Sequence, residues 1–294
     1  MELIHFSRPG VSAADADRLA AELGDLPLAL AQAAGFLAET GMPIERYLSL
    51  LETRAPELLE QSPPDSHPRS LAAAIQVSTD RLAEVDPAAL ALVRIGAFLA
   101  PEPIPTDVLI QHLPTTGDSL PPELEALTAA VASPVVVHRS LGRVSNYGLV
   151  RVVDCGLQLH RLTQTVLRDQ LTPDSAGSYR AYAQALLVAA DLGNEQDPEC
   201  WPGWARILPH LLVTDPATSP SSELRDLACR AAWYLYRRGD SHLARDIAEH
   251  LHQQWCKQVG PDDPHALRIA YALIQLLSDM GSHSQARQLG EDTL

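Results

Sequence analysis

Leu23-Gly24-Asp25-Leu26-Pro27-Leu28-Ala29-Leu30 is the stretch that decides how this chain folds, and residues 31–37 continue it with small and apolar side chains. We expect Gly24 to end a helix in the left-handed conformation and Asp25 to cap the helix that follows. Pro27 then falls in the first turn of that helix, where the N–H that proline lacks is not needed. The apolar residues recur at helical spacing, and the alanines let a neighbouring helix come close. The stretch therefore predicts a tight hinge between two packed helices.

Capping signals on both sides of this hinge predict a small helical domain over residues 1–60. Ser12 and Asp15 have the spacing of a capping box, which predicts the start of a helix before the hinge. Gly41 is expected to end the helix that follows the hinge. Residues 61–69 are rich in proline and serine, and we interpret them as a linker.

Residues 70–172 carry helical patterns together with β-branched runs. The expected helices cover residues 71–82, 88–99, 106–113, 122–132 and 162–171. Val135-Val136-Val137 and residues 149–153 are β-branched, and residues 157–160 follow the second run after a turn at Asp154-Cys155-Gly156. This pattern predicts a β-hairpin. Helices, a hairpin and a final helix are the order expected for a winged-helix domain.

A repeat begins near residue 221, after residues 173–220, which we expect to form a helical connector. Gly239-Asp240-Ser241-His242-Leu243-Ala244-Arg245 recurs as Gly281-Ser282-His283-Ser284-Gln285-Ala286-Arg287, an offset of 42 residues. The glycine allows the turn between paired helices, and the alanine lets them touch, which is the tetratricopeptide pattern. Residues 221–294 thus predict a tetratricopeptide array. Because such arrays usually need at least about three repeats and a cap, we interpret this array as truncated.

Composition and charge exclude several classes of function. The formal net charge is −15, from 37 acidic and 22 basic residues, so bulk electrostatics does not favour binding to nucleic acid or to anionic membranes. No segment approaches the roughly 18 uninterrupted apolar residues of a membrane span, and the N-terminus lacks a signal-peptide pattern. The 4 cysteines are far apart and form no C-x-x-C motif. These features favour a cytoplasmic protein with reduced thiols.

The hinge stretch resembles the "GLPLAL" segment of NB-ARC proteins, which are STAND signalling ATPases that include plant disease-resistance proteins and apoptotic protease-activating factors. In that family the segment lies in a small helical domain after the nucleotide-binding core, and its proline packs against the adenine of bound ADP. Pro27 matches that proline, whereas Asp25 stands where the family usually has glycine. The alternative interpretation is an ordinary buried helical hairpin.

A second resemblance lies at residues 157–166, which are similar to the Met-His-Asp motif of NB-ARC winged-helix domains. The histidine of that motif touches the β-phosphate of ADP and holds the closed state. His160 matches it, and Leu159 replaces the methionine. Arg161 replaces the aspartate with the opposite charge, so the role of the aspartate does not transfer. The alternative is a histidine at a strand end that bonds to a nearby carbonyl.

The sequence lacks the motifs of a self-contained active site. Nothing fits the P-loop pattern G-x-x-x-x-G-K-[ST], and Lys257, the only lysine, lies in the repeats. There is no G-x-S-x-G motif, and no cysteine lies beside a general base. His250 and His252 are two residues apart and point to different sides of a helix. We therefore expect no catalytic residue, no metal site and no cofactor bound by this chain alone.

These observations lead to one expectation for the mainly α chain and to two alternatives. The resemblance implies the regulatory and sensor portion of a STAND ATPase, which binds ADP or ATP through Pro27 and His160 once joined to the missing nucleotide-binding domain. Its tetratricopeptide groove would bind a protein partner, without contact to nucleic acid or membrane. The alternatives are a standalone tetratricopeptide adaptor for protein–protein interaction and a winged-helix regulator that binds DNA.

Overall fold

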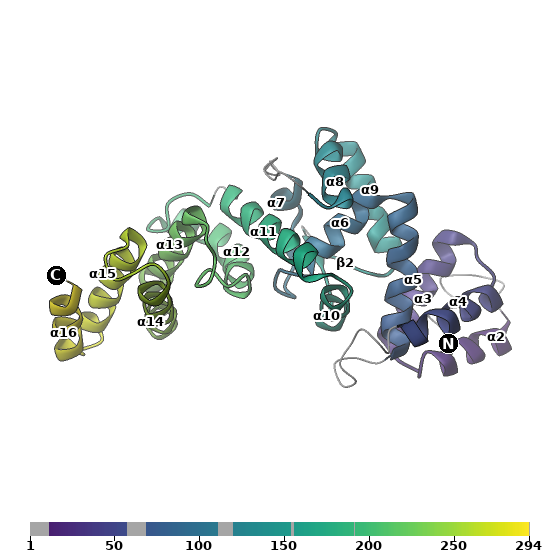
Figure 1. The fold of residues 1–294 in the computed structure, drawn as a ribbon, viewed down its shortest axis with the longest axis horizontal. Coiled ribbons are helices and arrows are strands. Elements are labelled where there is room, and N and C mark those ends of the chain that lie inside the picture. Colours follow the sequence, from purple (N-terminus) through teal and green to yellow (C-terminus); the bar gives the residue numbers. More distant parts are fainter. Residues whose placement is uncertain (1–11, 58–68, 111–119, 154–155, 191, 294) are drawn as a thin grey trace. The chain divides into compact units, whose positions relative to one another are not determined.

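The computed structural model describes residues 12–57, 69–110, 120–153, 156–190 and 192–293 (Figure 1). The described residues form a mainly α structure with one small three-stranded sheet, which confirms the prediction of a mainly α chain. The chain divides into two compact units, residues 1–183 and 184–294, which are taken in turn below. Of the helices that the structure describes, none combines the length and the apolar character that a membrane span requires.

The first unit begins with α2 (Ala13–Glu22), α3 (Pro27–Thr40) and α4 (Ile44–Glu57). The predicted N-cap is confirmed, because the Ser12 hydroxyl accepts the N–H of Asp15 at 3.1 Å, and the same hydroxyl donates to the Asp15 carboxylate at 2.6 Å. Gly41 ends α3 in the left-handed conformation, also as predicted.

The hinge between α2 and α3 differs from the prediction at one residue. Gly24 is left-handed as expected (φ +66°), but Asp25 is left-handed too (φ +53°) and does not cap α3. The cap position belongs to Leu26, which makes no side-chain capping bond, and Pro27 is the first helical residue. Asp25 instead donates its N–H to the carbonyl of Ala20 at 2.9 Å, so it completes the end of α2.

Five further helices continue the first unit. They are α5 (Arg69–Val85), α6 (Pro87–Gly96), α7 (Thr106–Ile110), α8 (Pro122–Val131) and α9 (Pro134–Asn146). Helix α5 packs on α3 and α4, while α6 is buried over most of its length and packs on α8 and α9. The predicted linker lies outside the described residues except for Arg69, which begins α5, and so does the predicted extension of α7 to residue 113.

The predicted strand at residues 135–137 is wrong, because these valines lie in the first turn of α9. Pro134 is suited to a first helical position, and apolar residues recur at helical spacing from there. Val137, Leu141 and Val144 are buried, whereas Val135 is 69% exposed. The pattern over the whole segment therefore outweighs the β propensity of three consecutive valines.

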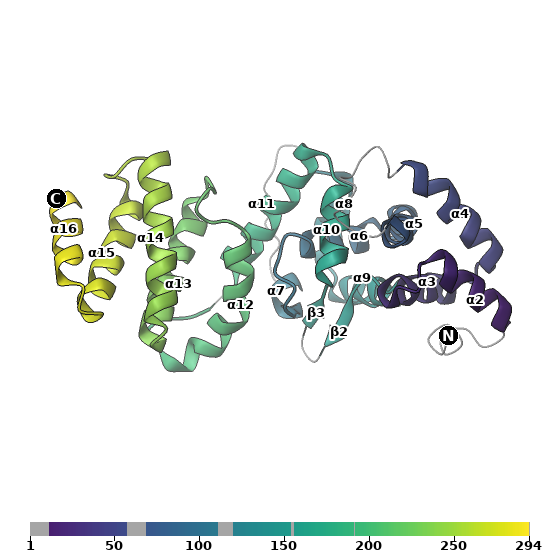
Figure 2. The ribbon, with the colours of Figure 1, turned by 90° about the horizontal axis from the view of Figure 1, so that it is seen from below.

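The predicted hairpin is confirmed by β2 (Arg151–Val153) and β3 (Gly156–Gln158), which pair antiparallel with Val152 opposite Leu157 (Figure 2). The sequence analysis missed β1 (Ile104–Pro105), which pairs with the other edge of β3 and gives the strand order β1-β3-β2. Residues 154 and 155 of the predicted turn lie outside the described residues. Helices α10 (Arg161–Asp169) and α11 (Pro173–Ala189) follow the sheet.

The second unit consists of helices, of which the last four form two similar pairs. The elements are η1 (Pro198–Cys200), α12 (Trp201–Val213), α13 (Ser222–Arg238), α14 (Ser241–Gln258), α15 (Pro264–Asp279) and α16 (His283–Thr293). Helices α13 and α15 begin 42 residues apart, and so do α14 and α16. Gly239 and Gly281 make the turns within the pairs at φ +94° and +80°. Ala244 and Ala286 are both buried, as the repeat predicts.

Candidate functional site

His160 lies between β3 and α10 and forms the N-cap of that helix. Its Nδ1 accepts the N–H of Leu162 at 3.2 Å. The partner of the ring is therefore an N–H, and not the carbonyl that the alternative interpretation expected. Because Nδ1 accepts, the proton of the neutral ring lies on Nε2. His160 is exposed, so this Nε2–H group is free to donate to a ligand.

Helix α10 is fixed to its surroundings by buried polar groups. Gln164 donates from Nε2 to the carbonyls of Gly96 and Leu99 at 3.0 and 2.9 Å. Gln32 of α3 donates from Nε2 to the Thr163 hydroxyl at 3.2 Å, in a fully buried position. Buried hydrogen bonds of this kind specify one arrangement, because breaking them leaves desolvated polar groups without partners. The bonds hold His160 in a defined position relative to α3.

Two glycines bring α3 close to the turn after α9. A Cβ atom at Gly35 would overlap the carbonyl oxygen of Asn146. A Cβ atom at Gly148, where φ is +70°, would lie 2.9 Å from the carbonyl oxygen of Ala31. The two backbones are thus in direct van der Waals contact, which residues with larger side chains would prevent.

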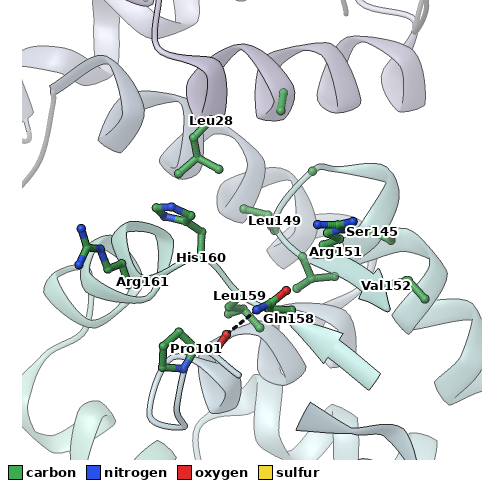
Figure 3. A pocket seen from close by; sticks show the side chains of 13 residues that line it. Leu28, Pro101, Ser145, Leu149, Arg151, Val152, Gln158, Leu159, His160 and Arg161 are labelled. Atoms are coloured by element: carbon green, nitrogen blue, oxygen red, sulfur yellow. Dashed lines mark hydrogen bonds between the residues drawn. The ribbon is translucent and has the colours of Figure 1, made fainter. Parts of the chain in front are cut away.

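The close approach of α3 creates a pocket of about 740 Å³ beside His160 (Figure 3). Leu28 and Ala31 of α3 contribute apolar surface on one side, and Leu149 and Leu159 contribute it from the segments around the hairpin. Figure 3 shows the Leu28 side chain directed toward His160. The volume is in the range of pockets that bind small molecules.

The charged side chains around this pocket are both cationic. Arg151 and Arg161 contribute to its lining beside His160, and none of the described lining residues is acidic. Neither arginine forms an ion pair within the described part of the chain, although the net charge of the protein is −15. The pocket therefore suits an anionic ligand that also carries an apolar or aromatic group.

The structure places the two predicted ligand-binding residues differently. His160 lines the pocket, whereas Pro27 is exposed at the start of α3 and is not among the lining residues, which begin with its neighbour Leu28. Sequence reasoning missed Arg151. It lies in β2 opposite Gln158, so pairing the two predicted strands could have placed it near His160.

A cysteine–histidine contact corrects the expectation that no cysteine lies beside a general base. Cys256 Sγ lies 3.3 Å from His252 Nε2, because residues four apart share one face of α14. Burial raises the pKa of the Cys256 thiol and lowers the pKa of His252. Both groups therefore favour their neutral forms, which is the opposite of an activated thiolate. In the described parts of the chain, no group of three or more His, Cys, Asp and Glu residues could hold a metal ion.

Comparisons with family models, with curated proteins and with solved structures found no match to this chain. The resemblance to NB-ARC proteins consequently depends on the residues quoted above.

Proposed function

We propose that this chain is the regulatory and sensor portion of a cytoplasmic STAND signalling ATPase. Its first unit would hold ADP in the inactive state, and its paired helices would bind a protein partner. The observation that carries the proposal is the pocket, because it brings His160 and the helix that begins at Pro27 to one place.

The arrangement of the first unit supports the assignment of a winged helix to residues 70–172. Its strands have the order β1-β3-β2, with helices before the hairpin and α10 after it. In this interpretation, α2 to α4 correspond to the small helical domain of NB-ARC proteins. The pocket then lies where the two motifs of the family would meet.

A nucleoside diphosphate has the chemistry that the pocket favours. Its base would contact the apolar surface around Leu28, and its phosphates would accept from the Nε2–H of His160. The sequence carries no P-loop, whose backbone amides and lysine supply much of the phosphate affinity in such ATPases. We therefore expect weak binding of ADP by this chain alone and tight binding only together with a P-loop core.

The paired helices support a role in protein binding. Trp233 of α13 and Tyr271 of α15 lie with ring centroids 6.0 Å apart, and Tyr271 is 57% exposed. Exposed aromatic side chains are typical of protein interfaces. A standalone adaptor would use the same surface, so only nucleotide binding separates that alternative from the proposal.

The charges on α10 favour a partner other than DNA. The guanidinium of Arg168 donates to the carbonyl of Ala97, and burial lowers its pKa. Arg161 is thus the exposed arginine that this helix offers, whereas recognition of DNA needs several cations for phosphates and base edges. A gel shift with mixed duplexes at low salt should show no sequence-dependent retardation.

Calorimetry on His160 variants tests the nucleotide assignment, with the chain joined to a P-loop core. A hydrogen bond to a charged phosphate contributes about 1.5–3 kcal/mol, so His160→Ala should weaken ADP binding by roughly tenfold to a hundredfold. The affinity for ATP should fall much less, because ATP favours the open state in the proposed scheme.

Two further variants separate loss of the ligand contact from loss of the helix cap. His160→Ser keeps a capping oxygen but is too short to reach the ligand, so it should behave like His160→Ala. His138→Ala removes an exposed histidine of α9 that does not line the pocket, and it should leave both affinities unchanged. Equal losses for ADP and ATP in the His160 variants would contradict the proposal, as would tight ADP binding by the isolated chain.

A further inference from the structure

Arg161 occupies a position that is electrostatically unfavourable for a cation. It is the first residue of α10, at the end where the helix dipole is positive. No carboxylate of the described chain pairs with its guanidinium, which is exposed. The helix would gain stability from a neutral or acidic residue here. A cation at this position is explained if it binds an anion that the helix end also attracts.

Arg161 directly follows His160 in the chain and lines the same pocket. In Figure 3 its guanidinium lies on the far side of His160 from Leu28 and points away from the other labelled side chains, so the long side chain must turn toward His160 to share a ligand with it. A ligand whose apolar part lies against Leu28 would then meet His160 first and the turned guanidinium of Arg161 beyond it. The planar guanidinium can donate two parallel hydrogen bonds to a phosphate group, and the N–H groups at the start of α10 add to the attraction.

We infer that Arg161 is a phosphate-binding residue of this pocket and receives the terminal phosphate of a nucleoside diphosphate beside His160. The inference rests on the proposed function, and it adds a contact at the position where the resemblance to the family assigns no role to this chain. The expected ligand is bound by three elements in order: the apolar surface of α3, the imidazole of His160 and the guanidinium of Arg161.

Arg151 provides a matched control within the same pocket. It is also an exposed arginine without an ion pair, but it lies in β2 beside Ser145 and away from Arg161 (Figure 3). Replacing either arginine by glutamine removes the same charge from the pocket lining. Only the variant at residue 161 removes the group that we place on the terminal phosphate.

The test is an NMR titration of the full chain with ADP, with adenosine and with inorganic pyrophosphate. Loss of a bidentate charged contact should weaken ADP and pyrophosphate binding by about tenfold or more in Arg161→Gln and leave adenosine binding unchanged. Arg151→Gln removes the same charge from the lining but not the group placed on the terminal phosphate, so it should weaken ADP and pyrophosphate binding clearly less than Arg161→Gln does. Pyrophosphate that binds as tightly as ADP would show that the pocket takes a free diphosphate, which would overturn the assignment to a nucleotide.

Thermal unfolding supplies a readout that separates binding from structure. Because Arg161→Gln removes a cation from the positive end of α10, its midpoint should equal or slightly exceed that of the parent protein. A lower midpoint together with weaker binding of all three ligands would indicate a structural role and overturn the inference.

The outcomes distinguish the inference from the proposed function. If ADP shifts the signals of Leu28 and His160 but Arg161→Gln binds it as tightly as the parent, the inference fails and the nucleotide pocket remains. If Arg151→Gln weakens ADP as much as Arg161→Gln does, the assignment of the terminal phosphate to Arg161 fails. If millimolar ADP shifts neither Leu28 nor His160, the proposed nucleotide pocket itself is wrong.

Discussion

The contact between α3 and the turn after α9 differs in kind from the contacts among the paired helices α13 to α16. In the first region two backbones touch at Gly35 and Gly148, which are far apart in the sequence and belong to no repeat. In the second region the helices pack through side chains such as Ala244 and Ala286, which recur 42 residues apart. A backbone contact tolerates no added atom, whereas side-chain packing can partly adjust. The two regions should therefore respond differently to small substitutions.

The largest effect is expected for Gly148→Ala. The added methyl group would meet the backbone of α3 at 2.9 Å, and alanine is strained at φ +70°. We expect a loss of about 2–4 kcal/mol in the free energy of unfolding, from overpacking and backbone strain together. Chemical denaturation measures this loss, and the variant should also lose ADP binding, because Ala31 and Gly148 both line the pocket.

Gly142→Ala is the control for this prediction. Gly142 lies in α9 with open space around the position of a Cβ atom, so alanine there should be neutral or stabilising by up to about 1 kcal/mol. Similar unfolding free energies for the two variants would contradict the direct contact between α3 and the turn.

A smaller effect is expected in the repeats, where the same substitution can be made at equivalent sites. Ala244→Leu and Ala286→Leu each add three carbon atoms to a buried position and should cost about 1–3 kcal/mol. Ala244→Leu should cost more, because α14 packs on both α13 and α15, whereas the described contacts of α16 are mainly with α15. Thermal unfolding of the two variants checks the order. A substantially larger loss at residue 286 would contradict this order.

The smallest effect is expected for the substitution of His252 on α14, and it concerns the pH dependence of stability. Burial lowers the pKa of His252 in the folded chain, so protonation favours unfolding. Its contribution to stability is fully present above the pKa of the unfolded state, near 6.5, and falls as the pH drops below that value. His252→Gln should therefore lower the pH dependence of the unfolding midpoint between about pH 7 and about pH 5. His250→Gln, at an exposed position of the same helix, is the matched substitution to compare with it.

Local signals predicted the parts of the fold that depend on neighbouring residues. Ser12, Gly24 and Gly41 mark helix ends because their capping interactions reach only a few residues along the chain. The paired helices were predictable because the same helix–turn–helix pattern appears twice at an interval of 42 residues. The missed elements depend on distant partners. Strand β1 has two residues and exists only through its pairing with β3.

The candidate site was predictable only in part for the same reason. His160 stood out because it lies between a predicted hairpin and a predicted helix. Its neighbours Leu28, Arg151 and Gly148 come from segments that the packing of α3 brings together. No local pattern in the sequence pairs Gly35 with Gly148, although both must be small for the pocket to form.

The contact at Gly35 and Gly148 has a consequence for how the first unit can move. Each glycine is flanked by residues with side chains, so a shift of α3 along its axis by one residue would place a Cβ atom against the opposing backbone. Positions displaced by one residue are therefore disfavoured, which holds α3 in a single register against the turn. A pocket that depends on this contact is present while α3 is seated and would be lost if α3 moved away. The pocket and the position of α3 are thus coupled, so a ligand that fills the pocket would favour the seated position.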